Sequence, residues 1–209
     1  MPHDQEGLAR AVARTGLKDR RIVEAFRRVP REEFVPEELR REAYGDRPVP
    51  IPEGQTTSQP TLIAHMIDAA APRSTDKVLE IGSGYGFQTA LLALLADRVI
   101  SIERWPVLVE AAQRNLERNG IEGASVYEGD GWKGWPEEAP YDVIVVSAAA
   151  DEVPRALVEQ LGEGGRLVIP VKRGGSDDVV LYRKEKGKLE TVRLVTPARF
   201  VPLVRGKDR

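Results

Sequence analysis

A glycine-rich turn in the middle of the chain is the segment whose residue types and spacing best suit ligand chemistry. Residues 78–86 read VLEIGSGYG, an apolar run that leads through Gly82, Gly84 and Gly86 into a helix-like stretch. Glycine at 82 and 84 lets the backbone turn sharply and approach a ligand closely, and the following helix presents unpaired N–H groups. Such a turn can also do no more than join a strand to a helix. Its meaning therefore depends on what neighbouring strands place beside it.

Acidic residues follow the next two apolar runs. Glu103 lies 21 residues after Gly82, close to the spacing of about 20 at which an acidic side chain accepts hydrogen bonds from ribose hydroxyls in α/β folds. A solvated carboxylate at a strand end is the ordinary alternative for Glu103. Asp130 follows the third run, where an adenine amino group could be held. Together with the glycine turn, these residues predict a pocket for a nucleoside-like ligand where three strand ends meet at the carboxyl edge of an open sheet.

The elements that must position these residues alternate between two types. Short runs rich in β-branched residues predict strands over 77–81, 98–102, 124–128, 141–147 and 166–171. Helix-like stretches over 87–96, 106–119 and 154–161 separate most of them. This alternation predicts an α/β fold: a doubly wound, Rossmann-like, mainly parallel sheet with helices on both faces. Residues 178–184 and 188–196 flank a turn and predict a C-terminal antiparallel hairpin at one sheet edge.

We expect a single domain over residues 1–209, in three parts. Residues 1–54 would form a flank that begins with one or two amphipathic helices over 5–28, broken near Gly16. The proline-rich residues 29–54 would form a loop that wraps on a neighbouring surface. We expect this loop to close when ligand binds. Residues 55–171 would form the ligand-binding core and begin with a helix from Pro60, capped by Ser58 or the threonines before it. Residues 172–209 would supply the edge hairpin and a C-terminal segment on the substrate side.

The composition excludes several classes of site. Cysteine is absent, and only His3 and His65 could supply imidazole, so thiolate chemistry is excluded and we predict no metal site and no Ser-His-Asp triad. A net charge of −2 gives no global attraction to nucleic acid or an anionic membrane, and no apolar run approaches the roughly 20 residues of a membrane span. The first ten residues lack the apolar core of a signal peptide, so we expect a cytoplasmic protein. We also expect a monomer.

The glycine spacing distinguishes between two adenosine-containing cofactors. The NAD fingerprint requires its third glycine at position 87, which is Phe87 here. The observed spacing resembles the Gly-x-Gly-x-Gly turn of class I S-adenosylmethionine-dependent methyltransferases. This resemblance implies S-adenosylmethionine as cofactor, with Glu80 near its methionine amino group and Glu103 on its ribose. Glu80 could instead be a buried carboxylate that local N–H groups satisfy.

A second segment narrows the choice of methyltransferase. Residues 54–60, GQTTSQP, look like the Gly-Gln-x-x-Ser-x-Pro segment of protein-L-isoaspartate O-methyltransferases. Further matches cover most of the chain, at residues 31–35, 43–44, 139–142, 148–154, 164–170 and 199–203. The chain departs from the residues commonest in that family at Tyr85, Thr57 and Asp151. These departures bear on the expected substrate preference and rate more than on the expected reaction class.

The resemblance implies methyl transfer to the free α-carboxyl of L-isoaspartyl residues in damaged proteins and peptides, followed by succinimide formation and partial repair. A peptide carboxylate has a pKa of about 4, so it is already an anionic nucleophile and needs no strong base. Ser58 is the expected catalytic residue, although a serine before Pro60 is also an ordinary helix cap. The expected cofactor-binding residues are Thr56, Thr57, Glu80, Gly82, Ser83, Gly84, Glu103, Arg104, Asp130 and Gly131. The expected substrate-binding residues are Gln55, Ser58, Ala148, Ala149, Val201, Leu203 and Val204.

Two other functions stay open at this stage. A methyltransferase of the same fold that acts on a small molecule or on RNA would keep the glycine turn and Glu103, but it gives no reason for residues 54–60. A non-catalytic module that binds a nucleoside ligand would keep the turn alone. Under the favoured interpretation the partners are damaged proteins and peptides, with neither nucleic acid nor membrane.

Overall fold

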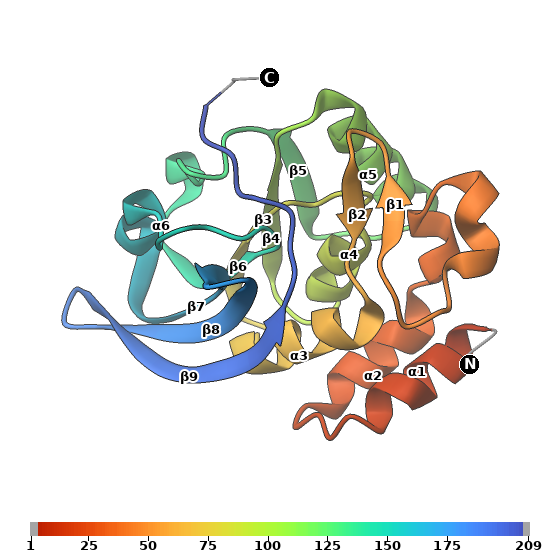
Figure 1. The fold of residues 1–209 in the computed structure, drawn as a ribbon, viewed down its shortest axis with the longest axis horizontal. Coiled ribbons are helices and arrows are strands. Elements are labelled where there is room, and N and C mark those ends of the chain that lie inside the picture. Colours follow the sequence, from red (N-terminus) through yellow and green to blue (C-terminus); the bar gives the residue numbers. More distant parts are fainter. Residues whose placement is uncertain (1–3, 207–209) are drawn as a thin grey trace.

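Seven strands form one twisted sheet, shown in Figure 1. The computed structural model describes residues 4–206, so His3 lies outside the described residues. In spatial order the strands are β5 (Ala124–Glu128), β4 (Arg98–Glu103), β3 (Lys77–Ile81), β6 (Tyr141–Val146), β7 (Leu161–Arg173), β8 (Ser176–Glu185) and β9 (Lys188–Ala198). The pairs from β5 to β7 are parallel, whereas β7–β8 and β8–β9 are antiparallel. The mainly parallel sheet and the antiparallel edge hairpin are both confirmed.

Alternate residues along the central strands point into two separate apolar cores, as the period of two along a strand requires. Val78, Val99 and Val143 pack on one face, and their neighbours Leu79 and Ile100 pack on the other. The first face is covered by α1 (Gln5–Ala13), α2 (Arg20–Arg28), α3 (Pro60–Ala70), α4 (Phe87–Ala93) and α5 (Pro106–Arg118). The second face is covered by α6 (Arg155–Gln160), because the connection from β5 to β6 contains only the 3-10 turn η3 (Pro136–Glu138). Helices on both faces are confirmed, with an unequal distribution.

The N-terminal flank is partly as predicted. The helices α1 and α2 lie on either side of Gly16, and the side chains of Asp4 and Asp19 accept hydrogen bonds from backbone N–H groups at their starts. The proline-rich part is more regular than the predicted loop. It contains the 3-10 helices η1 (Arg31–Phe34) and η2 (Glu37–Glu42), and the strand β1 (Val49–Ile51) pairs antiparallel with β2 (Gln55–Thr57).

The predicted cap of the helix α3 is wrong. The helix begins at Pro60 after Gln59, whose side chain makes no capping hydrogen bond. The Thr61 N–H in its first turn instead donates to the Asp46 carboxylate at 3.0 Å. Pro60 itself occupies the first turn as predicted, where its missing N–H has no intrahelical partner to lose. Because Ser58 does not cap the helix, its hydroxyl is available for another role.

The strand order creates a crevice between β3 and β6. From β3 the chain passes through α4 to β4 on one side, while β6 lies on the other side of β3. Loops that leave β3 and β6 therefore diverge at the carboxyl edge of the sheet, which is where open α/β sheets bind ligands. At the opposite edge, the Asp142 carboxylate accepts a hydrogen bond from the Lys77 backbone N–H at 2.8 Å, which is a structural role away from the ligand edge. None of the helices within residues 4–206 is long and apolar enough to cross a membrane.

Candidate active site

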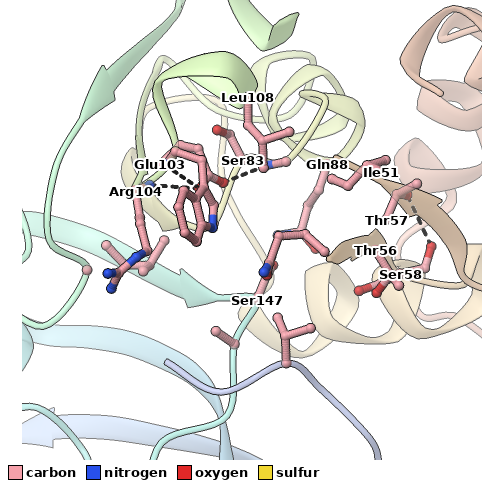
Figure 2. Close-up of a pocket in the computed structure, with 18 of the residues that line it drawn as sticks. Ile51, Thr56, Thr57, Ser58, Ser83, Gln88, Glu103, Arg104, Leu108 and Ser147 are labelled. Atoms are coloured by element: carbon pink, nitrogen blue, oxygen red, sulfur yellow. Dashed lines mark hydrogen bonds between the residues drawn. The ribbon is translucent and has the colours of Figure 1, made fainter. Parts of the chain in front are cut away.

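A pocket of about 850 Å³, including its open mouth, occupies this crevice. Figure 2 shows Glu103 and Arg104 on one side of the pocket, Thr56, Thr57 and Ser58 on the other, and Gln88 and Ser147 between them. The predicted site residues that line it are Gln55, Thr56, Thr57, Ser58, Gly82, Ser83, Gly84, Glu103, Arg104, Gly131, Ala148, Val201, Leu203 and Val204.

Glu103 ends β4 with its carboxylate fixed by the backbone. One oxygen, Oε2, accepts from the Gly84 N–H at 3.0 Å, and Oε1 accepts from the Arg104 and Trp105 N–H groups at 2.7 and 3.1 Å. Burial raises the pKa of Glu103 from its usual value, while these N–H groups act in the opposite direction. A carboxylate offers about four lone-pair sites, so three backbone donors leave capacity for a ligand hydroxyl.

The glycine turn supplies space and unpaired polar atoms. Gly84 has a φ of +54°, and a Cβ there would lie 3.2 Å from Cδ1 of Ile51. The Ser83 hydroxyl is buried against the pocket and has no hydrogen-bond partner among the described residues. A buried hydroxyl that no protein group satisfies, beside a carboxylate with spare lone pairs, is the arrangement expected of a polar ligand site.

Gly131, in the loop that follows β5, lines the pocket. A Cβ at this position would lie 2.4 Å from Cγ2 of Ile81 and 3.0 Å from Cδ1 of Leu203. Glycine is therefore required here by close packing, and the absent side chain keeps the pocket open between β3 and the C-terminal segment.

Ser58 lies where two cavities meet. A second groove shares Thr56, Ser58, Ser147 and Val201 with the first pocket. Its other walls come from the residue before β1, the start of α3, and the end of β9 with the residues after it: Pro48, Gln59, Thr61, Leu62, His65, Thr196, Pro197, Ala198, Arg199 and Phe200. A group bound in the first pocket and a group bound in the second would thus face each other at the Ser58 segment.

Glu80 is not among the residues that line the pocket. It is fully buried, and its Oε1 accepts from Nε2 of Gln88 at 3.0 Å, while Oε2 accepts from the hydroxyls of Thr89 and Ser101. Burial raises the pKa of Glu80, and the three donors oppose that rise. Gln88 also donates to the Ser147 hydroxyl at 2.9 Å, and both of these residues line the pocket. Glu80 therefore lies behind Gln88.

Asp130 and Ala149 also lie outside the lining, and both secure its walls. The Asp130 carboxylate accepts from the N–H groups of Trp132 at 2.9 Å and Gly206 at 3.1 Å. Ala149 donates to the carbonyl of Val201 and accepts from the N–H of Leu203, both at 2.8 Å. These contacts hold the C-terminal segment across the pocket, where it passes in front of the sheet in Figure 1.

Comparison with known proteins identifies the family. A sequence model described as protein-L-isoaspartate(D-aspartate) O-methyltransferase matches residues 3–208. The chain belongs to this family. The protein-L-isoaspartate O-methyltransferase of Methanoculleus marisnigri is 51% identical over 189 residues, which are 90% of this chain and 86% of that protein.

One solved structure agrees with this family assignment, and a second shows the same fold. A protein-L-isoaspartate O-methyltransferase superposes with a TM-score of 0.85 at 33% identity, covering 97% of this chain and 66% of that one. A structure from Plasmodium falciparum, assigned to the same enzyme and in complex with S-adenosyl-L-homocysteine, has a TM-score of 0.80 at 24% identity and shows a similar fold. It is matched over 99% of this chain and 100% of that chain. The resemblance drawn from residues 54–60 and 78–86 is confirmed.

Several pocket residues escaped the sequence reasoning. Gln88, Trp105 and Leu108 line the pocket from positions just after the glycine turn and after Glu103. The signal that could have found them is their distance of a few residues from a predicted strand end. Ile51 gave no such signal, because it reaches the pocket through the pairing of β1 with β2.

The two tryptophans that follow β5, Trp132 and Trp135, lie outside the pocket. Trp132 donates its indole N–H to the Leu203 carbonyl at 2.9 Å, and the Trp135 ring stacks on Tyr127 at 4.8 Å between centroids. Neither residue lines the pocket, so both act in packing.

Proposed function

We propose that this chain transfers a methyl group from S-adenosylmethionine to the free α-carboxyl of L-isoaspartyl residues in damaged proteins and peptides. The observation that carries the proposal is the meeting of two cavities at Ser58. Methyl transfer between two substrates needs a donor site and an acceptor site that share a wall at the reacting atoms. Family membership supports the same reaction.

The first pocket suits the cofactor. The spare lone pairs of Glu103 would accept from ribose hydroxyls, and the unpartnered Ser83 hydroxyl would bond a polar group of the ligand. When bound, S-adenosylmethionine supplies a methyl group on a sulfonium centre that an oxygen anion can take, leaving S-adenosylhomocysteine. The remaining proposed cofactor-binding residues are Thr56, Thr57, Glu80, Gly82, Gly84, Arg104, Asp130 and Gly131. Among them, Glu80 would act from behind Gln88, and Asp130 through the segment that it holds.

The second groove suits a peptide. Its walls include the Ser58 segment, the end of β9 and the residues that follow β9. The proposed substrate-binding residues are Gln55, Ser58, Ala148, Ala149, Val201, Leu203 and Val204. Ser58 and Val201 line this groove as well as the first pocket, whereas Gln55, Ala148, Leu203 and Val204 line the first pocket alone and Ala149 lines neither.

The residues of this chain would align and desolvate the nucleophile. A carboxylate with a pKa of about 4 is ionised at neutral pH, so no group has to remove a proton from it. The Ser58 hydroxyl would donate to one carboxylate oxygen and direct the other toward the first pocket. Walls that replace water by a few fixed dipoles would raise the reactivity of the anion.

Label transfer from methyl-labelled S-adenosylmethionine tests the proposal. The acceptors are an isoaspartyl peptide and its ordinary aspartyl twin, which differ only in the position of one backbone bond. We expect label on the isoaspartyl peptide alone, in a form that alkali releases as methanol. Label on neither peptide contradicts the proposed function, and label on both contradicts the substrate class.

Localisation, assembly and domain organisation are further proposals that rest on the sequence. We propose a cytoplasmic monomer that folds as one unit over residues 1–209 and binds no nucleic acid or membrane. Sedimentation equilibrium at micromolar concentration should give the mass of one 23.1 kDa chain. Calorimetry should give a single unfolding transition, and two separated transitions would contradict the one-domain proposal.

A further inference from the structure

Arg31 is a fully buried cation that no carboxylate pairs with. Its relative exposure is 0%, and none of the ion pairs within residues 4–206 includes it. Burial lowers the pKa of Arg31 to about 10, and Asp46 acts in the opposite direction, so the guanidinium is charged at neutral pH. Burying a charged group that lacks an ionic partner is costly. The cost has to be offset by hydrogen bonds to neutral groups.

The guanidinium binds carbonyls of two separate segments, residues 43–47 and Ser58. Nη1 donates to the carbonyl of Ala43 and, at 3.2 Å, to that of Gly45. Nη2 donates to the carbonyl of Arg47 at 3.3 Å and to that of Ser58 at 2.9 Å, across 27 residues of chain. The rigid planar fork of arginine fixes these carbonyls relative to one another, which a lysine ammonium would not do.

The Arg31 side chain also contacts the start of α4, directly after the glycine turn. Its guanidinium carbon lies 5.6 Å from the ring centroid of Phe87, the first residue of α4 after the glycine turn. Phe87, Thr57 and Ser58 all line the first pocket. Arg31 therefore joins the turn that would hold the cofactor to the segment that would hold the substrate carboxylate.

We propose that Arg31 is a positioning residue that holds the Ser58 segment in register with the glycine turn for methyl transfer. The inference rests on the proposed function. Arg31 itself would touch neither substrate nor cofactor, since it lies outside the lining of both cavities. Its effect would be on the alignment of the two cavities, where a displacement of about 1 Å can cost about a hundredfold in rate.

Arg31→Lys tests the inference, with Arg166→Lys as the matched control. Arg166 is also a mostly buried arginine, whose guanidinium donates to the Ala71 carbonyl at 2.7 Å and to the Asp76 carboxylate. Neither partner lines a cavity at the site. For each variant we would measure kcat and KM with the isoaspartyl peptide, the Kd of S-adenosylhomocysteine, and the thermal midpoint.

We expect both variants to lose stability, and only Arg31→Lys to lose at least about tenfold in kcat at temperatures where it is fully folded. Its Kd for S-adenosylhomocysteine should stay within about threefold of wild type, because the carboxylate and turn that bind the ligand are intact. A kcat that falls no further than in Arg166→Lys overturns the inference.

Arg31→Gln, which keeps a planar group with two N–H donors, is measured in the same way if Arg31→Lys does not fold. Failure of both variants to fold would assign Arg31 to the stability of the whole fold and overturn the positioning role. The wild-type turnover separates the two proposals. An inactive wild type refutes the proposed function, whereas an active wild type with unaffected variants refutes only the inference about Arg31.

Discussion

Replacing Glu103 by glutamine separates the binding of cofactor from the support of the glycine turn. In the wild type both carboxylate oxygens are occupied, Oε1 by two backbone N–H groups and Oε2 by that of Gly84. A glutamine that keeps the two bonds at Oε1 turns its NH₂ group toward the Gly84 N–H, so that two donors face each other. One backbone N–H is then left without an acceptor.

The magnitudes follow from these contacts. An unsatisfied buried N–H costs about 1–3 kcal/mol, which the removal of a buried negative charge partly offsets, so the free energy of unfolding should change by less than about 2 kcal/mol. A ligand hydroxyl bonded to a charged acceptor contributes about 1.5–3 kcal/mol, so the affinity for S-adenosylhomocysteine should fall by about ten- to a hundredfold. Titration calorimetry and thermal unfolding measure the two effects on one sample.

The pH dependence gives a second signature. Because burial raises the pKa of Glu103 above its usual value of 4.5, the folded protein holds this proton over a pH range in which the unfolded chain has released it. The contribution of Glu103 to stability therefore falls as pH rises from 4.5 through the raised pKa. Affinity should rise over the same window, as the carboxylate that accepts the ligand hydroxyls forms. Both slopes should be smaller in Glu103→Gln, where Glu80, whose pKa burial also raises, still titrates.

Glu128→Gln is the matched control for these measurements. Glu128 ends the neighbouring strand β5 in register with Glu103, but it is exposed and lies outside the pocket. Its replacement should leave affinity within about twofold of wild type, since surface substitutions of this kind have small effects. Equal losses of affinity in the two variants, or none in Glu103→Gln, would refute the assignment of Glu103 to the cofactor.

Three further substitutions test other parts of the site. Ser58→Ala should lower kcat by at least about tenfold while the Kd of S-adenosylhomocysteine changes little, because the proposed partner of the hydroxyl is the acceptor carboxylate. Equal losses in both, or full activity, would count against its role. Gly131→Ala places a Cβ 2.4 Å from Ile81 and should destabilise by about 1–3 kcal/mol, or about 2–4 °C of thermal midpoint per kcal/mol. Gly45→Ala, whose Cβ would meet its neighbours no closer than 3.4 Å, is its control and should not lower the midpoint. Glu80→Gln should keep the thermal midpoint, because the hydroxyls of Thr89 and Ser101 can accept as well as donate hydrogen bonds. It should weaken the binding of S-adenosylhomocysteine about three- to tenfold and leave the binding of 5′-methylthioadenosine, which lacks the amino-acid end, unchanged. Equal changes for the two ligands would assign Glu80 to structure alone.

The sheet and its ligand edge could be predicted because their signals are local. A run of β-branched residues marks a strand without reference to the rest of the chain, and β3 has the same bounds as predicted, 77–81. Parallel strands bring their carboxyl ends together, so the turn at Gly82 and the carboxylate of Glu103 had to become neighbours once the fold class was known.

The contacts across the pocket could not be predicted, because they join irregular segments distant in sequence. Trp132 bonds the carbonyl of Leu203 across 71 residues, and Arg31 bonds that of Ser58 across 27. No periodicity encodes such pairs. The wrong helix cap has the same origin: the sequence shows a serine before Pro60, but the segment is held extended by its pairing with β1 and by Arg31.

Closure of the proline-rich segment over bound cofactor stays a prediction, and the structure limits how large it can be. Ile51 already lines the pocket, at 3.2 Å from the position of a Cβ on Gly84, and Arg31 ties residues 43–47 to Ser58. A rearrangement that kept these bonds would have to be confined to the β1–β2 hairpin, whose strands have only three residues each.

The chemistry explains why so few ionisable side chains are needed at this site. When the nucleophile is already an anion, rate has to come from alignment and from the exclusion of water rather than from proton transfer. Alignment depends on fixed backbone, and here the fixed points are a guanidinium bound to carbonyls, a carboxylate bound to N–H groups and a C-terminal segment bridged to Ala149. The substitutions with the largest effect on kcat should therefore lie at these anchoring contacts and at Ser58, and not at His65, the only histidine among the described residues.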